Sequence, residues 1–246
     1  MSIQTEEELR QLRAIGLIVR QALNAMQEAV EPGITTGELD AICARVLAGQ
    51  GASSAPRKVY NFPGSCCISV NDEAIHGVPG SRALREGDLV KLDVTAEKNG
   101  YYADAAVTVH AGSASEPAAS LARCAQSAFS SAMRAARPGA RVYEIGRAVQ
   151  REVRRSGFNV LPEYGGHGIG RTIHELPHVP NYPDLMQRAR LHSGLVLAVE
   201  PIITAGSGQS FVDRDGWTVR TADHTLAAHY EHTIVITRGT PYLVTA

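Results

Sequence analysis

Two aspartates of the chain lie in a segment whose sequence predicts a β-hairpin. The dipeptide Asn99-Gly100 separates two runs of alternating polar and apolar residues, which is a strong signal for a two-residue hairpin turn. With that turn, Asp104 faces Thr95, and Asp93 lies diagonal to Asp104 on the same face, ~7–8 Å away. Two carboxylates at this separation can share an ion. The alternation over residues 91–97 also fits the solvent-exposed face of a half-buried hairpin, so these residues alone leave both interpretations open.

Three more polar side chains lie in sequence contexts that suggest a bound ion or a paired charge. His167 stands in Gly165-Gly-His-Gly-Ile-Gly170, where the glycines let the backbone come close to a ligand or an ion. Glu200 and Glu231 each lie in an apolar, strand-like run, and a buried charge is normally paired or bound to metal. With the aspartate pair they form a hard, oxygen-rich donor set with one imidazole. Such a donor set is suited to Mn, Fe, Co or Zn in a two-metal hydrolytic centre. It is less suited to a zinc site whose ligands are thiolates.

Other motifs of the sequence do not support a competing chemistry. The segment His174-Glu-Leu-Pro-His178 matches the zinc motif H-E-x-x-H, but that motif needs a helix, and Pro177 disfavours helix at the residue before it. The glycine run around His167 lacks the strand-to-helix context of a dinucleotide-binding fingerprint. The adjacent thiols of Cys66 and Cys67 have no evident local base, so we expect them to be packed or to line a pocket.

Two pairs of helices are expected to hold these residues in place. Capping-box patterns followed by an apolar face predict one helix over residues 5–30 and a second from residue 35 to about 49. The second half of the chain repeats the pattern, with helices around residues 121–133 and 144–153. Strand-like segments follow each pair, at 67–70, 89–95, 195–204 and 231–237. This repetition predicts a pseudo-twofold α+β fold, and because no linker divides the halves, we expect residues 1–246 to form a single domain.

Composition limits the class of protein. The chain has 24 Lys and Arg against 25 Asp and Glu, a net charge of −1, and this lack of a basic footprint argues against nucleic acid as a partner. A hydrophobic fraction of 44 % excludes wholesale disorder. No apolar run is long enough to span a membrane, and the N-terminal segment does not resemble a signal peptide. The four cysteines form no disulfide pattern, so we expect a reducing, cytoplasmic compartment.

A longer, ordered set of short motifs runs from about residue 57 to residue 237. The motifs are Phe62-Pro-x-Ser, Cys67-Ile-Ser-Val-Asn71, His76-Gly-Val-Pro79, Leu92-Asp93-Val with Asp104 beyond it, Gly166-His-Gly-Ile-Gly-Arg171, His174-Glu, Glu200-Pro, Trp217 and Glu231-His-Thr. Together they resemble the methionine aminopeptidases, metallopeptidases of the pita-bread fold. The short interval between His174 and Glu200 is similar to that of the type I enzymes.

The resemblance implies a fold, a reaction and a ligand set. The fold would be a pseudo-twofold antiparallel sheet covered by two helix pairs. The enzyme would remove N-terminal methionine from nascent proteins and peptides with a small second residue, by a dinuclear-metal-activated hydroxide. Asp104 and Glu231 would bridge two divalent ions (Co, Mn, Fe or Zn). Asp93 would hold one ion, and His167 with Glu200 would hold the other.

The resemblance also implies which residues meet the substrate. The methionine side chain would lie among Phe62, Cys67, Ile173 and Trp217, because a thioether favours soft and aromatic walls. His76 and His174 would contact the peptide and the tetrahedral intermediate, and Glu200 would move a proton. Core packing of the four pocket residues, and backbone hydrogen bonding by the two histidines in turns, are the alternatives.

The chain departs from the pattern of the family at two places beside expected ligands. Ala105 and Ala106 follow Asp104, where hydroxyl residues are usual, and His229 stands where a glutamine is usual. Both departures bear on metal preference and rate.

Two other functions fit the same resemblance. One is a proline-directed pita-bread aminopeptidase, and the other is a non-catalytic pita-bread binding protein. The expected partners of the methionine aminopeptidase are nascent polypeptide N-termini, near the ribosome, with no nucleic acid or membrane, and the expected state is a monomer.

Overall fold

The helices begin where the capping patterns predict. In the computed structural model, which describes residues 1–246, helix α1 (Glu6–Ala29) follows Thr5, whose side chain accepts a hydrogen bond from the backbone of Glu8. The Glu8 carboxylate in turn accepts from the Thr5 backbone, which completes a capping box. Helix α2 (Thr36–Gly49) begins with a capping box of its own. The first predicted helix pair is therefore confirmed.

The second helix pair is also present, and one short helix was not predicted. Helices α4 (Glu116–Ala135) and α5 (Val142–Arg155) match the second pair. Helix α3 (Ala55–Tyr60) has only six residues. A single turn and a half cannot show a repeating apolar face, so the sequence pattern gives no signal for it.

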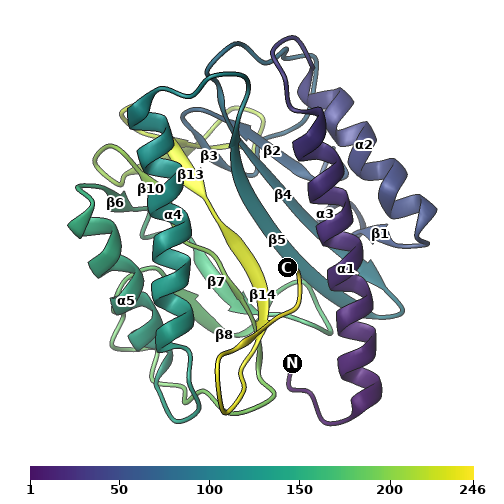
Figure 1. Cartoon of the computed structure of the whole chain (residues 1–246), viewed down its shortest axis with the longest axis vertical. Coiled ribbons are helices and arrows are strands. Elements are labelled where there is room, and N and C mark those ends of the chain that lie inside the picture. The colour runs from purple at the N-terminus through teal and green to yellow at the C-terminus, as the bar shows by residue number, and fades with distance from the viewer.

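The central sheet is antiparallel and has nine strands. Seven of them lie in the order β1-β4-β5-β14-β9-β7-β8, while β2 pairs with β4 and β15 pairs with β14. Their bounds are β1 (Ser53–Ser54), β2 (Cys67–Val70), β4 (Leu89–Lys98), β5 (Tyr101–His110), β7 (Gly165–Gly168), β8 (Glu175–Pro180), β9 (Val196–Val199), β14 (Glu231–Val235) and β15 (Tyr242–Leu243). Figure 1 shows α1 and α2 lying over one half of the sheet and α4 and α5 over the other half. The predicted fold class is confirmed.

Two small sheets of three strands complete the fold. One has the order β13-β10-β6 and the other β11-β12-β3. Their bounds are β3 (Glu73–Ile75), β6 (Asn159–Val160), β10 (Ile202–Thr204), β11 (Ser210–Val212), β12 (Val219–Thr221) and β13 (Ala227–His229). The strand-like run predicted over 195–204 is therefore wrong as one element, because it divides into β9 and β10. Pro201 lies at the division, where a residue without an N–H interrupts the ladder.

The hairpin of β4 and β5 has the predicted register. Asn99 and Gly100 form the turn and both have positive φ, +54° and +76°, as a type I′ turn requires. Thr95 pairs with Asp104, and Asp93 pairs with Ala106. The two aspartates consequently lie on the same face of the sheet.

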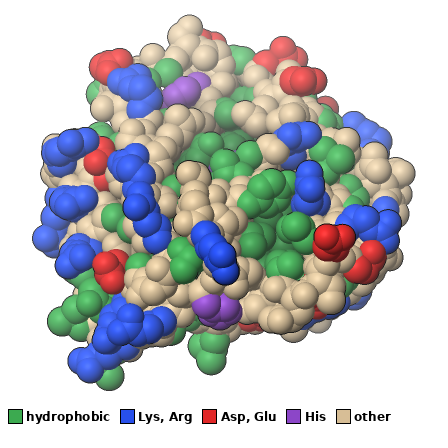
Figure 2. Space-filling model, turned by 60° about the horizontal axis from the view of Figure 1, so that its bottom comes forward, with side chains coloured by type: hydrophobic (Ala, Val, Ile, Leu, Met, Phe, Trp, Pro, Cys, Tyr) green, Lys and Arg blue, Asp and Glu red, His purple; other side chains and the backbone are tan.

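Two apolar cores lie between the sheet and its helices, one under each pair. Val19 and Met26 of α1 are fully buried in the first, and Phe129 of α4 and Val149 of α5 are buried in the second. None of the helices is long and apolar enough to cross a membrane. Figure 2 shows basic side chains gathered along the left margin, the side on which Figure 1 places α5. The charge of the surface is therefore uneven although the net charge is only −1.

Candidate metal centre

Five consecutive strands of the central sheet bring the predicted metal ligands together. In the order β4-β5-β14-β9-β7, they carry Asp93, Asp104, Glu231, Glu200 (the residue directly after β9) and His167. Residues that are far apart in the sequence thus become neighbours across one face of the sheet. The pairing of β5 with β14 joins the two halves, and it consists of only two residue pairs.

The register of the strands sets the spacing of the acidic residues. Ala106 pairs with Asp93 on one side and with Glu231 on the other, so its small side chain leaves the space between the two carboxylates open. Asp104 lies two residues before Ala106 and therefore faces the same way. Its backbone N–H donates to Thr233 Oγ1 at 2.8 Å, and that hydroxyl donates to the Asp104 carbonyl at 2.9 Å. Asp104 is thereby fixed to β14.

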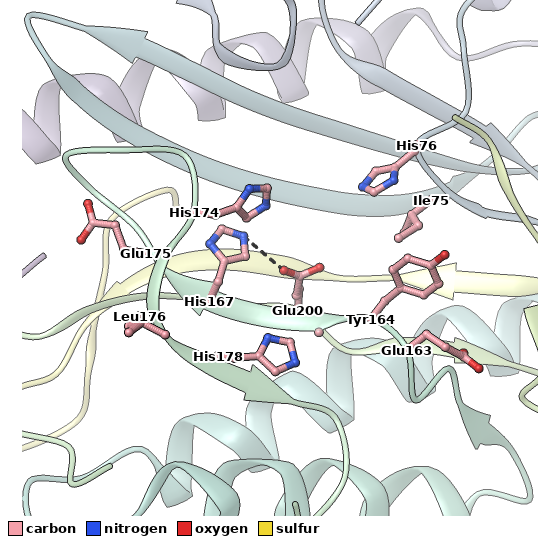
Figure 3. A pocket seen from close by; sticks show the side chains of 11 residues that line it. Ile75, His76, Glu163, Tyr164, His167, His174, Glu175, Leu176, His178 and Glu200 are labelled. Atoms are coloured by element: carbon pink, nitrogen blue, oxygen red, sulfur yellow. Dashed lines mark ion pairs between the residues drawn. The ribbon is translucent and has the colours of Figure 1, made fainter. Parts of the chain in front are cut away.

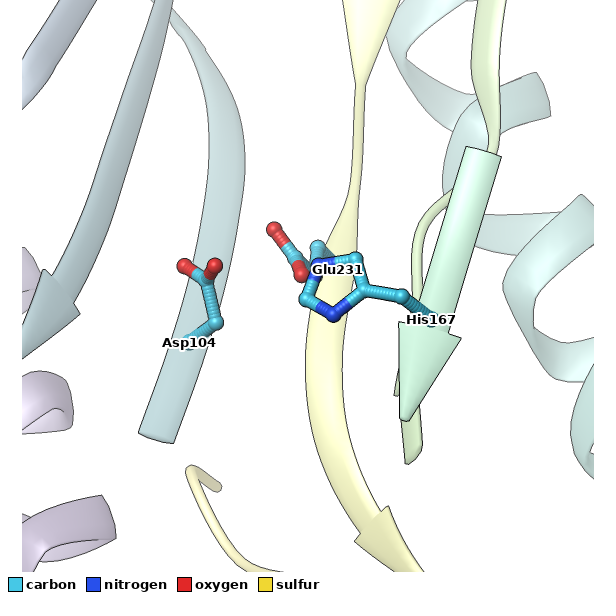
Figure 4. A group of neighbouring side chains, drawn as sticks. All are labelled: Asp104, His167 and Glu231. Carbon is cyan, nitrogen blue, oxygen red and sulfur yellow. The ribbon is translucent and has the colours of Figure 1, made fainter. Parts of the chain in front are cut away.

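The imidazole of His167 has one nitrogen free to bind metal. Its Nδ1 lies 2.9 Å from the carbonyl oxygen of Gly168, which makes Nδ1 the protonated nitrogen and leaves the lone pair on Nε2. Nε2 lies 3.5 Å from Glu200 Oε1, the contact drawn in Figure 3. Ligand atoms of His167, Asp104 and Glu231 all lie within 4.8 Å of one another, and Figure 4 shows these three side chains converging from β7, β5 and β14.

The buried polar atoms of this cluster fit divalent cations. Asp104 and Glu231 are 6 % and 2 % exposed, and Oδ1 of Asp104 and Oε1 of Glu231 have no hydrogen-bond partner. A buried carboxylate oxygen without a partner is costly unless a cation compensates it. Four clustered carboxylates with one neutral imidazole supply both the charge and the donor types that such cations prefer.

The titration behaviour of the cluster follows from burial and from mutual repulsion. Burial, and then the charges of Asp104 and Glu200, raise the pKa of Asp93 and of Glu231 well above that of an ordinary carboxyl. Burial, and then the charge of Asp104, raises the pKa of Glu200 in the same way. Burial also raises the pKa of Asp104 to about 6, and burial followed by His174 lowers the pKa of His167 to about 3. The imidazole of His167 is therefore neutral at physiological pH, the state in which it can bind metal.

A cavity of about 120 Å³ adjoins the acidic cluster. It is lined by all five predicted metal ligands and by all six predicted substrate residues, Phe62, Cys67, His76, Ile173, His174 and Trp217. The rings of Phe62 and Trp217 meet edge to face at 5.3 Å and form an aromatic wall.

The two predicted catalytic histidines lie where this cavity opens into a wider groove of about 500 Å³. Nδ1 of His174 is 2.6 Å from the hydroxyl of Tyr60, and its ring is 4.2 Å from the ring of His167. His76 has a positive φ of +56° and its ring contacts Tyr164 edge to face at 6.3 Å. Figure 3 shows both histidine rings on the same side of Glu200.

Two expectations about motifs have clear outcomes. The segment after His174 is strand β8 and not a helix, so the rejection of the H-E-x-x-H motif is confirmed. The explanation offered for the glycines around His167 is wrong for Gly166 and Gly168. A Cβ on Gly166 would meet the carbonyl oxygen of Ala198, and one on Gly168 would meet that of Leu176. These glycines admit neighbouring strands, not a ligand.

Sequence reasoning missed three residues of the cavity, Pro56, Tyr60 and Thr95. Tyr60 comes from the unpredicted helix α3 and contacts His174. Thr95 also lines the cavity, and it was predicted only as the residue facing Asp104. A lone aromatic residue and a strand threonine carry no motif, so only the three-dimensional structure reveals them. The thiol of Cys67 is buried, which raises its pKa, and this agrees with a pocket-lining thiol.

Comparison with known proteins gives consistent matches over the whole chain. The family model described as metallopeptidase family M24 matches residues 10–238. Methionine aminopeptidase 2 of Bacillus subtilis (strain 168) is 43 % identical over 247 aligned residues, covering 100 % of this chain and 99 % of the relative. The crystal structure of a methionine aminopeptidase from Thermotoga maritima has a TM-score of 0.96 at 34 % identity and covers 100 % of this chain and 99 % of that chain. That of the Rickettsia prowazekii enzyme has a TM-score of 0.95 at 33 % identity, with both chains covered completely.

Proposed function

Because the chain belongs to the methionine aminopeptidases of metallopeptidase family M24, we propose that it removes N-terminal methionine from peptides and nascent proteins whose second residue is small. We assign this activity to residues 1–246 as a single catalytic domain. The observation that carries the proposal is that the acidic cluster and the aromatic wall of Phe62 and Trp217 line one cavity. The release of a terminal methionine needs both in one place.

The metal ligands are proposed residue by residue. Asp104 and Glu231 would be shared by two divalent ions, Asp93 would hold one of them, and Glu200 with His167 would hold the other. Co, Mn, Fe or Zn would satisfy these donors. When bound, the ions would supply Lewis acidity toward the scissile carbonyl and a binding site for the lone pair of the neutral α-amine of the substrate.

We propose roles for the surrounding side chains that agree with their positions. Phe62, Cys67, Ile173 and Trp217 enclose the methionine side chain and exclude water from it. Glu200, whose pKa is raised by burial, takes a proton from the attacking water and returns it to the leaving amine. His174 presents Nε2 to the groove, because Nδ1 is in contact with Tyr60, and donates to the oxygen that gains charge. His76, across the opening, contacts the peptide backbone.

The setting of the reaction is proposed from its substrate. Nascent N-termini emerge at the ribosome, so we expect a monomer that works in the cytoplasm near ribosomes. The exposed arginines of α5, and the basic side chains gathered along the left margin of Figure 2, support an encounter with that acidic particle.

The test is a comparison of two peptides with and without metal. Met-Ala-Ser should be cleaved and Ala-Pro-Ala should not, and a chelator should abolish cleavage until Co, Mn or Fe is added back. Preference for Ala-Pro-Ala would indicate a proline-directed enzyme. Tight binding of two ions without turnover of either peptide would point to a binding protein, and equal turnover with and without a chelator would contradict the two-metal proposal.

A further inference from the structure

A second imidazole lies against the acidic cluster and belongs to none of the five proposed ligands. His229 is only 2 % exposed, and neither of its ring nitrogens has a hydrogen-bond partner. Its Nε2 is 3.5 Å from Glu231 Oε2 and 3.7 Å from Glu200 Oε2. These three residues form a group whose ligand atoms all lie within 4.8 Å of one another. The buried ring therefore faces two carboxylates that are already expected to bind metal.

The backbone holds the ring of His229 in this position from two sides. His229 is the last residue of β13 and pairs with Ile202 of β10, a residue that closely follows Glu200 in the chain. Its N–H donates to Thr108 Oγ1 at 2.9 Å, and its carbonyl accepts from the same hydroxyl at 2.7 Å. Thr108 belongs to β5, the strand of Asp104. The ring is thus anchored to the strands that carry the ligands.

The distances match those between donors that share one ion. Zinc and similar ions lie about 2.0–2.2 Å from nitrogen and oxygen ligands, which puts neighbouring donors of a tetrahedral site about 3.4 Å apart. The separations of His229 Nε2 from the two carboxylates, 3.5 and 3.7 Å, are close to this value. They are too long for a hydrogen bond of ordinary strength.

We propose that His229 is a sixth protein ligand of the metal centre, and that its Nε2 binds an ion together with Glu200 and Glu231, the two carboxylates that it faces. This rests on the proposed function, because it assumes the five-ligand centre. With an imidazole beside the two carboxylates, that ion has a softer ligand set than it would have with carboxylates alone. The consequence is a preference for Zn, Co or Fe over Mn at this position.

A direct test counts the histidines that bind a metal probe. Cadmium-113 is bound to enzyme whose histidines carry nitrogen-15, and the one-bond coupling between the two nuclei is read by NMR. Native enzyme should show two coupled imidazole nitrogens, and His229→Gln should show one. As a matched control, His232→Gln should leave both couplings, because the similarly buried ring of His232 is paired with Thr245 at 2.9 Å.

The affinity of the site gives a second readout that does not depend on activity. Calorimetric titration with Co(II) should show binding weakened in His229→Gln on the order of 10–100-fold, with a smaller change for Mn(II). Circular dichroism of both variants checks that they are folded. A single coupled histidine in native enzyme would overturn the assignment and leave His229 as a neighbour of the carboxylates. Absence of any bound cadmium or cobalt in native enzyme would instead overturn the metal centre itself.

Discussion

The contact between Tyr60 and His174 allows the effect of removing either side chain to be worked out separately. Burial lowers the pKa of His174, so its imidazole is neutral at physiological pH. In the tautomer with a proton on Nε2, the Tyr60 hydroxyl donates to Nδ1 at 2.6 Å and Nε2 donates into the groove. Loss of such a donor typically slows kcat by ~10²–10³, or about 3–4 kcal/mol. We expect His174→Ala to keep its metal and its fold while losing kcat by this factor, with a smaller change in KM.

The Tyr60→Phe variant should have a much smaller effect. It removes one neutral hydrogen bond, which contributes about 0.5–1.5 kcal/mol and corresponds to a ~2–10-fold change in rate. Because Tyr60 is 42 % exposed, water can replace the hydroxyl, and we expect the lower part of this range. Since Tyr60 acts through His174, adding Tyr60→Phe to His174→Ala should produce no further loss of kcat.

The assay is steady-state cleavage of Met-Ala-Ser by the four forms of this cycle. Metal content and melting temperature are measured on the same preparations. Near-normal kcat in folded, metal-loaded His174→Ala would remove His174 from the catalytic residues. An equal loss from Tyr60→Phe in both backgrounds would show that the tyrosine contacts substrate itself and does not position the histidine.

Three other substitutions test the centre and its surroundings. In the proposed centre Asp104 supplies a charge that both ions share, and Asp104→Asn removes it. Elemental analysis should therefore find less metal per chain, and turnover should fall by several orders of magnitude. Two tightly bound ions with normal turnover would refute the bridging role. Gly166→Ala would press a Cβ against a carbonyl of β9, so the melting temperature should fall by an amount equivalent to about 1–3 kcal/mol. An unchanged melting temperature would contradict the close approach of β9 to Gly166. The third substitution concerns Asp72. Burial alone would raise the pKa of this carboxyl, but hydrogen bonding to His224 and the charge of Arg220 hold the pKa below its ordinary value. The Asp72 carboxylate therefore stabilises the fold above about pH 4, and this stabilisation is lost as the pH falls through its lowered pKa. In Asp72→Asn, the melting temperature should consequently change less with pH on the acid side.

Sequence patterns a few residues long were sufficient to predict the hairpin turn between β4 and β5 and the start of α1. The positive φ angles that Asn99 and Gly100 adopt determine the turn, and the turn determines which residues face each other from Thr95 to Asp104. The capping box at Thr5 likewise identifies the start of α1 within one residue. In both cases the interacting groups are a few positions apart, so the sequence pattern contains the whole interaction.

Contacts between distant strands could not be obtained in this way. Nothing in the residues around His229 indicates that β13 pairs with β10 or that the ring faces Glu200. The glycine at 166 was read as room for a ligand, whereas the space is taken by the backbone of β9. The ligand set itself came from resemblance to a family, because the order of strands in a sheet depends on packing over the whole chain.

The narrow junction between β5 and β14 links the stability of the protein to the supply of its metals. Two of the four carboxylates come from the strands on one side of this junction, and the other two from those on the opposite side. Without cations, burial and mutual repulsion raise the pKa values of these carboxyls, and bound cations would hold them together across a pairing of only two residue pairs. By mass action, a cation present at 100 times its dissociation constant stabilises the folded form by about 2.7 kcal/mol. Starvation for metal would therefore lower the amount of folded protein as well as the activity of each molecule.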